Sequence, residues 1–278
     1  MKLSSTHNHS TGSDGKLSPE EVVKKAIELK WEYIYFTDHY PNPREVNVKF
    51  KDKDFFNKNY VSEVKQLKEK YKDKIEVYLG VELGWLENYS NWLKEQLKKQ
   101  KYDYVIGSIH DIIDKDNKSH PVEWELKGWI EGAEKFGGAE NYVKEYYKQI
   151  KLMIKSGLFD SVGHLDYISV YNRKNNLFSE DSDWYKKEIF ESLDLIKKHK
   201  MALEINASGI RKREEQFPSL WILKEARKRN IPITLGLDAH YPENFDSESM
   251  KKIIDIAKQA GYNEVVRFEK RKMIKEKI

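Results

Sequence analysis

The stretch SPEEVVKKAIELKWEYIYFTDH, residues 18–39, predicts a helix followed directly by a strand. Ser18 is the predicted N-cap, and Glu21, three residues further on, completes a capping box. The apolar side chains of the helical part fall on one face, at Val22, Val23, Ala26 and Ile27. The run Tyr33–Phe36 then has the aromatic and β-branched residues of a strand. This stretch therefore defines one helix–strand unit of an α/β fold.

The same alternation repeats along the whole chain without a Ser-, Gly- or Pro-rich linker. Seven short apolar runs are predicted strands, at 2–6, 33–36, 76–79, 104–107, 161–163, 202–205 and 233–235. Further helices are predicted around 56–71, 90–100, 139–156, 183–199, 218–229 and 247–260. These units predict a single α/β domain over residues 1–278, with parallel strands in a barrel-like or doubly wound sheet.

Two segments depart from the alternation. The run 265–268 is a predicted edge strand after the last helix. The stretch 112–138 is rich in Lys, Asp, Trp and Gly, and it predicts a long loop with a short helix near the mouth of the site.

Composition excludes several classes of protein. Of the 278 residues, 39% are hydrophobic, which is enough for a packed core. No run of 18 apolar residues occurs, and the first ten residues lack the apolar stretch of a signal peptide, so we expect no membrane span and a cytoplasmic protein. The net charge is only +4 and is spread along the chain, which disfavours nucleic acid as a partner.

The absence of cysteine restricts the metal chemistry of the chain. No disulfide, thiolate nucleophile or cysteine-bound metal is possible, so any ion must be held by imidazole and carboxylate. His7 and His9 follow the first predicted strand and point the same way if that strand continues through them. A single His-x-His is weak evidence by itself, because a surface loop also carries such pairs.

Metal-ligating residues also follow the other predicted strands. Every strand except the sixth ends in such a residue, and the chain carries them at His7, His9, Asp14, Asp38, His39, Glu82, His110, His164, Asp166, Asp238 and His240. Six of the eight histidines lie at these positions, and only His120 and His199 do not. Because the carboxyl ends of parallel strands open on one face, we expect these side chains to converge.

Each of these residues taken singly has an ordinary structural explanation, such as a helix cap or a buried, hydrogen-bonded histidine. Taken together, the six histidines with Asp14, Glu82 and Asp238 make nine donors, more than one ion binds. The sequence therefore predicts a cluster of two or three metals. Glu82 is the predicted bridging carboxylate, because it comes from a central strand.

The sixth predicted strand is followed by a different set of residues. Asn206, Ser208 and Arg211 offer an amide, a hydroxyl and a guanidinium, which together suit a phosphate group. Lys212 and Arg213 are interpreted as a solvated basic loop. Arg173, nine residues after His164, is a second candidate for phosphate binding.

On these motifs the chain resembles the polymerase and histidinol phosphatase (PHP) superfamily, and within it the stand-alone histidinol-phosphate phosphatases. The resemblance covers nearly the whole chain. It rests on His7-x-His9 with Ser13-Asp14-Gly15, Thr37-Asp38-His39, Gly80-Val81-Glu82, Gly107-Ser108-Ile109-His110, Gly163-His164-Leu165-Asp166, the run from Leu203 to Arg211, and the run from Ile231 to His240.

The resemblance implies a distorted (β/α)7 barrel of the PHP type, a trinuclear site of zinc, iron or manganese, and hydrolysis of a phosphate monoester. It implies three ligand sets: His7, His9, Glu82 and Asp238; Glu82, His110 and His164; and Asp14, His39 and His240. Some relatives carry histidine in place of Asp14. After His110, phosphatase relatives tend to carry an aromatic residue and then Asp-Gly, whereas this chain has Asp111-Ile112-Ile113, a difference that concerns substrate identity more than chemistry.

The leading hypothesis is metal-assisted hydrolysis of L-histidinol phosphate in histidine biosynthesis. A hydroxide bridging two ions attacks phosphorus in line, while Arg211 neutralises phosphate oxygens. Asp38 and Asp166, each beside a predicted metal ligand, are expected to orient that ligand or to protonate the leaving alkoxide. The alternatives are a PHP phosphoesterase acting on nucleotides, oligonucleotide ends or phosphotyrosine, and a module without catalytic activity. The oligomeric state is left open.

Overall fold

Six parallel strands form a curled half-barrel at the centre of the computed structural model, which describes residues 4–43 and 59–278. The strand order is β1-β2-β3-β6-β7-β8. Their bounds are β1 Tyr33–Phe36, β2 Glu76–Gly84, β3 Tyr104–Ser108, β6 Ser161–Val162, β7 Ala202–Asn206 and β8 Ile233–Gly236. The strands are almost entirely buried, as expected for a parallel sheet enclosed by helices. The predicted parallel α/β barrel is therefore confirmed.

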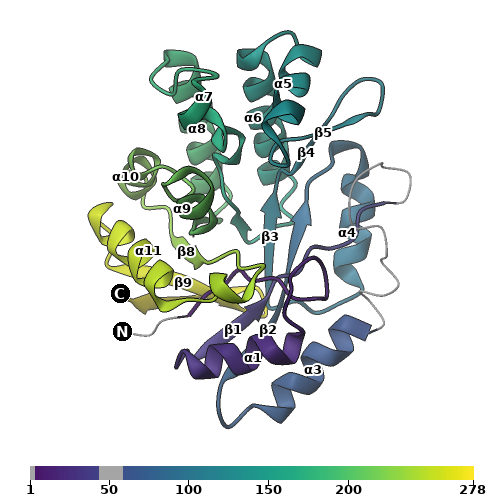
Figure 1. The fold of residues 1–278 in the computed structure, drawn as a ribbon, viewed down its shortest axis with the longest axis vertical. Coiled ribbons are helices and arrows are strands. Elements are labelled where there is room, and N and C mark those ends of the chain that lie inside the picture. Colours follow the sequence, from purple (N-terminus) through teal and green to yellow (C-terminus); the bar gives the residue numbers. More distant parts are fainter. Residues whose placement is uncertain (1–3, 44–58) are drawn as a thin grey trace.

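Helices surround the sheet (Figure 1), and the predicted helices are found close to their expected positions. They are α1 Pro19–Glu28, α3 Val61–Lys70, α4 Ser90–Lys98, α6 Ala139–Lys155, α8 Asp183–Lys198, α10 Leu220–Lys228 and α11 Ser247–Gln259. The capping box at the start of α1 forms as predicted, with Ser18 and Glu21 bonding to each other's backbone N–H. Among the described residues, no helix combines the length and the apolar composition needed to cross a bilayer.

The predicted strand 2–6 lies partly outside the described residues, and its described part is not a regular strand. Residues 6–9 instead form an extended segment between β8 and β1. The Thr6 N–H donates to Leu235 O at 2.9 Å, the His9 N–H donates to Ala239 O at 3.0 Å, and Asn8 O accepts from Thr37 N–H at 3.1 Å. The ladder of backbone hydrogen bonds between this segment and residues 235–239 is interrupted, because the Leu237 N–H donates to the Ser5 hydroxyl rather than to a backbone carbonyl. This segment still occupies the gap between the first and last strands of the sheet.

The stretch 112–138 is more ordered than predicted. It contains an antiparallel hairpin, β4 Asp111–Ile113 and β5 Ser119–Pro121, followed by the ten-residue helix α5 Leu126–Lys135. The hairpin turn forms because Asp114 Oδ1 accepts from the N–H groups of Asp116 and Lys118, both at 2.9 Å. The prediction of a long loop was wrong, since strands of three residues leave no periodic pattern in the sequence, whereas the helix predicted in this stretch is found as α5.

The predicted edge strand 265–268 does not join the main sheet. It forms β9 Glu264–Glu269, which pairs antiparallel with β10 Lys272–Lys277. This hairpin covers the amino-terminal end of the barrel, where the Phe268 ring stacks on Tyr104 at 5.0 Å. The cluster at this end consists of Tyr33, Tyr35, Tyr78, Tyr104, Ile106, Ala202, Val266 and Phe268. Aromatic side chains therefore close the end of the barrel opposite to the strand carboxyl ends.

We expect Phe268→Ala to lower the free energy of unfolding by about 3–5 kcal/mol, because it opens a cavity in this cluster. Met273→Ala, in the exposed face of β10, is the matched control and should change it by about 0.5 kcal/mol or less. Urea unfolding followed by circular dichroism measures both. Equal effects of the two substitutions would contradict this role of Phe268.

Candidate metal centre

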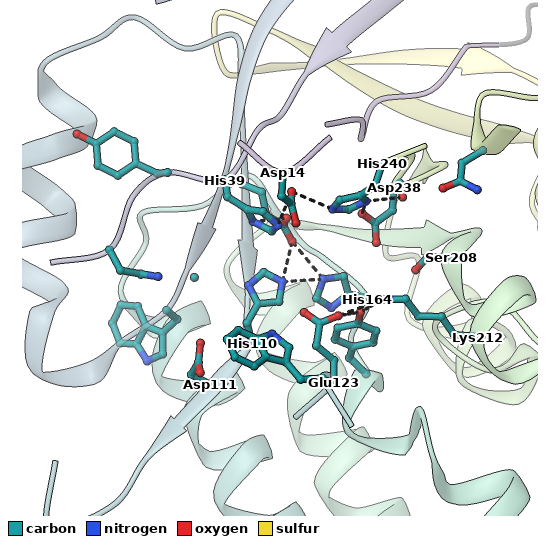
Figure 2. A pocket seen from close by; sticks show the side chains of 18 of the residues that line it. Asp14, His39, His110, Asp111, Glu123, His164, Ser208, Lys212, Asp238 and His240 are labelled. Atoms are coloured by element: carbon teal, nitrogen blue, oxygen red, sulfur yellow. Dashed lines mark hydrogen bonds and ion pairs between the residues drawn. The ribbon is translucent and has the colours of Figure 1, made fainter. Parts of the chain in front are cut away.

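The nine predicted metal ligands lie together at the carboxyl end of the half-barrel, as Figure 2 shows for Asp14, His39, His110, His164, Asp238 and His240. They come from the segment 7–14 and from the residues at or just after β1, β2, β3, β6 and β8. Seven of them line a cavity of about 640 Å³: Asp14, His39, Glu82, His110, His164, Asp238 and His240. His7 and His9 are fully buried beneath it.

Glu82 lies at the centre of the cluster. Its Oε1 is 3.3 Å from His110 Nε2 and 3.1 Å from His164 Nε2. Its Oε2 is 3.3 Å from His7 Nε2, 3.5 Å from His9 Nε2 and 3.1 Å from His39 Nδ1. Burial opposes the charge of this carboxylate, but the surrounding imidazoles hold its pKa well below the usual range. One carboxylate thus faces five imidazoles.

Asp14 is the centre of a second group of side chains. Its Oδ1 lies 3.2 Å from His240 Nε2, 3.8 Å from His39 Nε2 and 3.9 Å from His9 Nδ1. Burial would raise the pKa of Asp14, but the hydrogen bond with His240 and the nearby imidazoles lower it. These side chains are close enough to hold one ion together.

Asp238 connects the two groups of ligands. Its Oδ1 is 3.3 Å from His9 Nε2 and 3.4 Å from His240 Nδ1. Its backbone is in the left-handed region, with φ of 51°. Asn206 Nδ2 donates to its Oδ2 at 3.3 Å, so β7 supports the ligand that follows β8.

The donor atoms fit bound metal ions. His7 Nε2 is 3.0 Å from His9 Nε2, and His110 Nε2 is 3.3 Å from His164 Nε2. Two imidazole lone pairs repel at this distance unless a proton or a cation lies between them. Burial, and next the adjacent His240 and His39, lower the pKa of His9 to about 3, so His9 is a neutral donor at neutral pH.

Glu204 on β7 orients one of these imidazoles. Its Oε1 lies 2.6 Å from His7 Nδ1, which directs His7 Nε2 toward Glu82. Glu204 was not predicted, although it lies two residues before Asn206 and so faces the same side of the strand. Imidazole and carboxylate donors converging in this way form a metal site.

Asp38 and Asp166 do not line the cavity. Asp38 accepts hydrogen bonds from the Ser10 N–H and the Ser13 hydroxyl, both at 2.7 Å, and from the Tyr60 hydroxyl, and it thereby holds the turn that carries Asp14. Burial raises the pKa of Asp38. These contacts favour orientation of the site over proton transfer for Asp38.

Asp166 stabilises the loop that follows β7. Its Oδ2 accepts from Arg213 Nη2 at 2.9 Å and from the Ser219 N–H and hydroxyl, both at 3.0 Å. The Arg213 side chain is fully buried, so the interpretation of this residue as part of a solvated loop was wrong. Its guanidinium is retained in the core because it is paired with a carboxylate.

The predicted phosphate-binding residues separate into two groups. Ser208 and Arg211 line the cavity, and Arg211 Nη2 donates to Leu237 O at 2.9 Å and Asp238 O at 3.2 Å. Asn206 is buried beneath them, and its Oδ1 accepts from the Ser208 hydroxyl at 2.6 Å. Arg173 forms an ion pair with Glu215 and does not line the cavity.

Sequence reasoning missed one polar group of the cavity wall. Lys212 Nζ lies 3.0 Å from Glu123 Oε2 and 4.7 Å from the centre of the Tyr167 ring, and the Tyr167 hydroxyl donates to Glu123. Burial would raise the pKa of Glu123, but Lys212 and then His110 lower it to about 2. Lys212 is 39% exposed, as expected for a solvated residue, but it also lines the cavity and pairs with Glu123. Glu123 lies in the irregular stretch, where no pattern pointed to it.

Comparisons with known proteins agree with this site. The chain is 28% identical to the "Probable histidinol-phosphatase" of Deinococcus radiodurans, over 95% of this chain and 94% of that one. It is 27% identical to the histidinol-phosphatase of Lactococcus lactis, over 100% and 98% of the two chains. A crystal structure of the Lactococcus lactis enzyme complexed with zinc, L-histidinol and phosphate matches with a TM-score of 0.80 and 26% identity, covering 98% of this chain and 99% of that one.

A family model decides the family. The model of the PHP domain matches residues 5–208, most of the chain. The match includes the segment with His7, His9 and Asp14, the strand that carries Glu82, His110 just after β3, and the phosphate-site candidate Ser208. With this match, the parallel half-barrel and the convergent histidines and carboxylates, the chain belongs to the PHP domain family.

Proposed function

We propose that the protein is a metal-dependent phosphomonoesterase that hydrolyses L-histidinol phosphate to L-histidinol and phosphate. The observation that carries this proposal is the convergence of nine imidazole and carboxylate donors beside a cavity that Arg211 and Lys212 also line. A metal cluster next to fixed cations is suited to the charge that develops on phosphate oxygens. The reaction belongs to histidine biosynthesis, and the cytoplasmic location stays a prediction.

The proposed metal site holds three divalent ions, of zinc, iron or manganese. The short distances around Glu82 support His7, His9, Glu82 and Asp238 as one ligand set and Glu82, His110 and His164 as another. The grouping of Asp14 with His39 and His240 supports a third. Zinc is favoured because the related Lactococcus lactis structure contains it. When bound, such ions lower the pKa of water and neutralise phosphate oxygens.

The other residues have positioning and binding roles in this proposal. Arg211 and Ser208 bind the phosphate, and Asn206 orients Ser208 and Asp238. Asp38 holds the Asp14 turn, and Asp166 holds the end of the short helix 208–213 from which Arg211 projects. Each fixes its partner through several short hydrogen bonds, which is how outer residues keep a metal site in place.

Histidinol phosphate is favoured over other phosphomonoesters by the relatives. Of the two curated relatives named above, one is a "Probable histidinol-phosphatase" and the other a histidinol-phosphatase, and their similarity extends over almost the whole chain. The solved relative was crystallised with L-histidinol and phosphate, the two products of this hydrolysis. Nucleotides, oligonucleotide ends and phosphotyrosine stay as competing substrates that the first experiment distinguishes.

Phosphate release measured with purified, metal-analysed protein tests this function. We expect kcat/KM for histidinol phosphate to exceed that for a nucleoside monophosphate, phosphotyrosine and a short oligonucleotide by at least about a hundredfold. A chelator should abolish the activity because the bound ions supply the charge stabilisation. Activity that survives removal of all metal would overturn the mechanism, and a preferred nucleotide would overturn the substrate.

Glu82→Gln should reduce kcat by at least about a thousandfold and lower the metal content, because an amide cannot replace a bridging carboxylate. Glu76→Gln is the matched control, since Glu76 is at the exposed start of the same strand and should keep full activity. Metal analysis, phosphate release and circular dichroism are measured on both variants. A Glu82→Gln protein with normal metal content and turnover would disprove the bridging role.

Arg211→Met should lower kcat/KM by about a hundredfold, because it removes a cation from the phosphate site. Arg173→Met provides the comparison: Arg173 is 45% exposed and bound to Glu215, so we expect less than about a threefold change. Steady-state kinetics on histidinol phosphate measures both. If the two substitutions have the same effect, the phosphate is bound elsewhere.

A further inference from the structure

Asp111 presents a carboxylate to the cavity without a cationic partner. Its Oδ1 accepts a hydrogen bond from the Ser119 hydroxyl, and its side chain lines the cavity. Within residues 4–43 and 59–278, no Lys or Arg forms an ion pair with it. One oxygen is thus held in place while the other remains available to a ligand.

The other acidic group of this wall differs in its charge balance. Glu123 is neutralised by Lys212 and accepts a second hydrogen bond from the Tyr167 hydroxyl. An incoming cation would have to displace Lys212 to bind Glu123. Among the residues that the structure describes, no Lys or Arg competes in this way for Asp111, so its carboxylate is open to a cationic substrate group.

The hairpin that carries Asp111 is fixed in position. The Val122 N–H donates to His110 O at 3.0 Å, directly beside Asp111, and Ile113 packs on the buried Leu86 that follows β2. A carboxylate on a supported hairpin loses little freedom when it binds a ligand. The geometry therefore favours a preformed cation site.

Asp111 and Lys212 lie in different parts of the cavity wall. Figure 2 places Asp111 on one side of His110 and His164, and Lys212 on the other. Arg211 and Lys212 project from α9 Ser208–Arg213, whereas Asp111 begins β4 after β3. A substrate whose phosphate contacts the metal ligands and α9 would direct its other end toward Asp111.

We propose that Asp111 binds a cationic ammonium group on the alcohol half of the substrate and thereby selects phosphate esters of amino alcohols. This inference rests on the proposed phosphomonoesterase function of the same site. It assigns a specificity residue that holds the substrate and takes no part in breaking the P–O bond. Histidinol phosphate has such an amine, and so do simpler esters such as phosphoethanolamine.

The test compares esters that differ only in the amine. Kinetics are measured for histidinol phosphate against its deamino analogue, and for phosphoethanolamine against propyl phosphate. In the wild type we expect kcat/KM to favour the ammonium ester of each pair. Asp111→Asn, which keeps an oxygen for Ser119, should reduce that preference about ten- to a hundredfold, since a charged hydrogen bond becomes a neutral one. In the same variant, kcat/KM for the amine-free esters should change by less than about threefold.

Asp116→Asn is the matched control, because Asp116 is at the tip of the same hairpin, 60% exposed and paired with Lys135. This substitution should leave unchanged the ratio of kcat/KM values for the ammonium ester and the amine-free ester in each pair. A wild type without preference for the amine, or an Asp111→Asn variant with an unchanged preference, would overturn the inference. If the wild type favours phosphoethanolamine but does not hydrolyse histidinol phosphate, the proposed substrate fails while the role of Asp111 stands. If no ester is hydrolysed, both fail.

Discussion

The charge of Glu82 is the constraint on which the rest of the site depends. A buried carboxylate is costly unless opposite charge or hydrogen-bond donors surround it. Here the five imidazoles and the Ser108 hydroxyl, which donates to Oε1 at 2.6 Å, surround both oxygens. The imidazoles come from four different segments of the chain, since His7 and His9 share one, so these segments must come together for the charge to be stabilised.

The two ends of the half-barrel have opposite chemistry, and each depends on a segment outside the regular sheet. At the amino ends, β9 and β10 cover a cluster of aromatic rings that includes Tyr104 and Phe268. At the carboxyl ends, the segment 6–9 fills the gap between β8 and β1 and brings two histidines under the cavity. Apolar packing at the amino ends stabilises the fold, and the carboxyl ends carry the polar side chains of the site, as is common in parallel barrels.

Around the candidate metal ligands, buried charged side chains are held by hydrogen bonds to other protein groups rather than solvated by water. Asp38 holds the turn of Asp14, the pair of Asp166 and Arg213 holds the end of α9, which carries Arg211, and Glu204 orients His7. The cavity wall carries both signs of charge: Lys212 is paired to Glu123, whereas Asp111 accepts a hydrogen bond from Ser119 and forms no ion pair with a Lys or Arg of the described residues. A substrate with a phosphate at one end and an ammonium at the other fits this distribution of charge.

The sequence by itself determined the α/β alternation and the positions of the candidate metal ligands. Capping at Ser18, apolar periodicity and polar residues after each strand are local signals, and the parallel arrangement then requires His39, Glu82 and His110 to meet. It did not determine the 111–121 hairpin, the position of the hairpin formed by residues 264–277, or the buried ion pair between Arg213 and Asp166. Only the tertiary structure decided these features. Strands of three residues are too short to show an alternating pattern in the sequence. Asp166 and Arg213 are 47 residues apart in the sequence, and they meet only because of the way the loops pack.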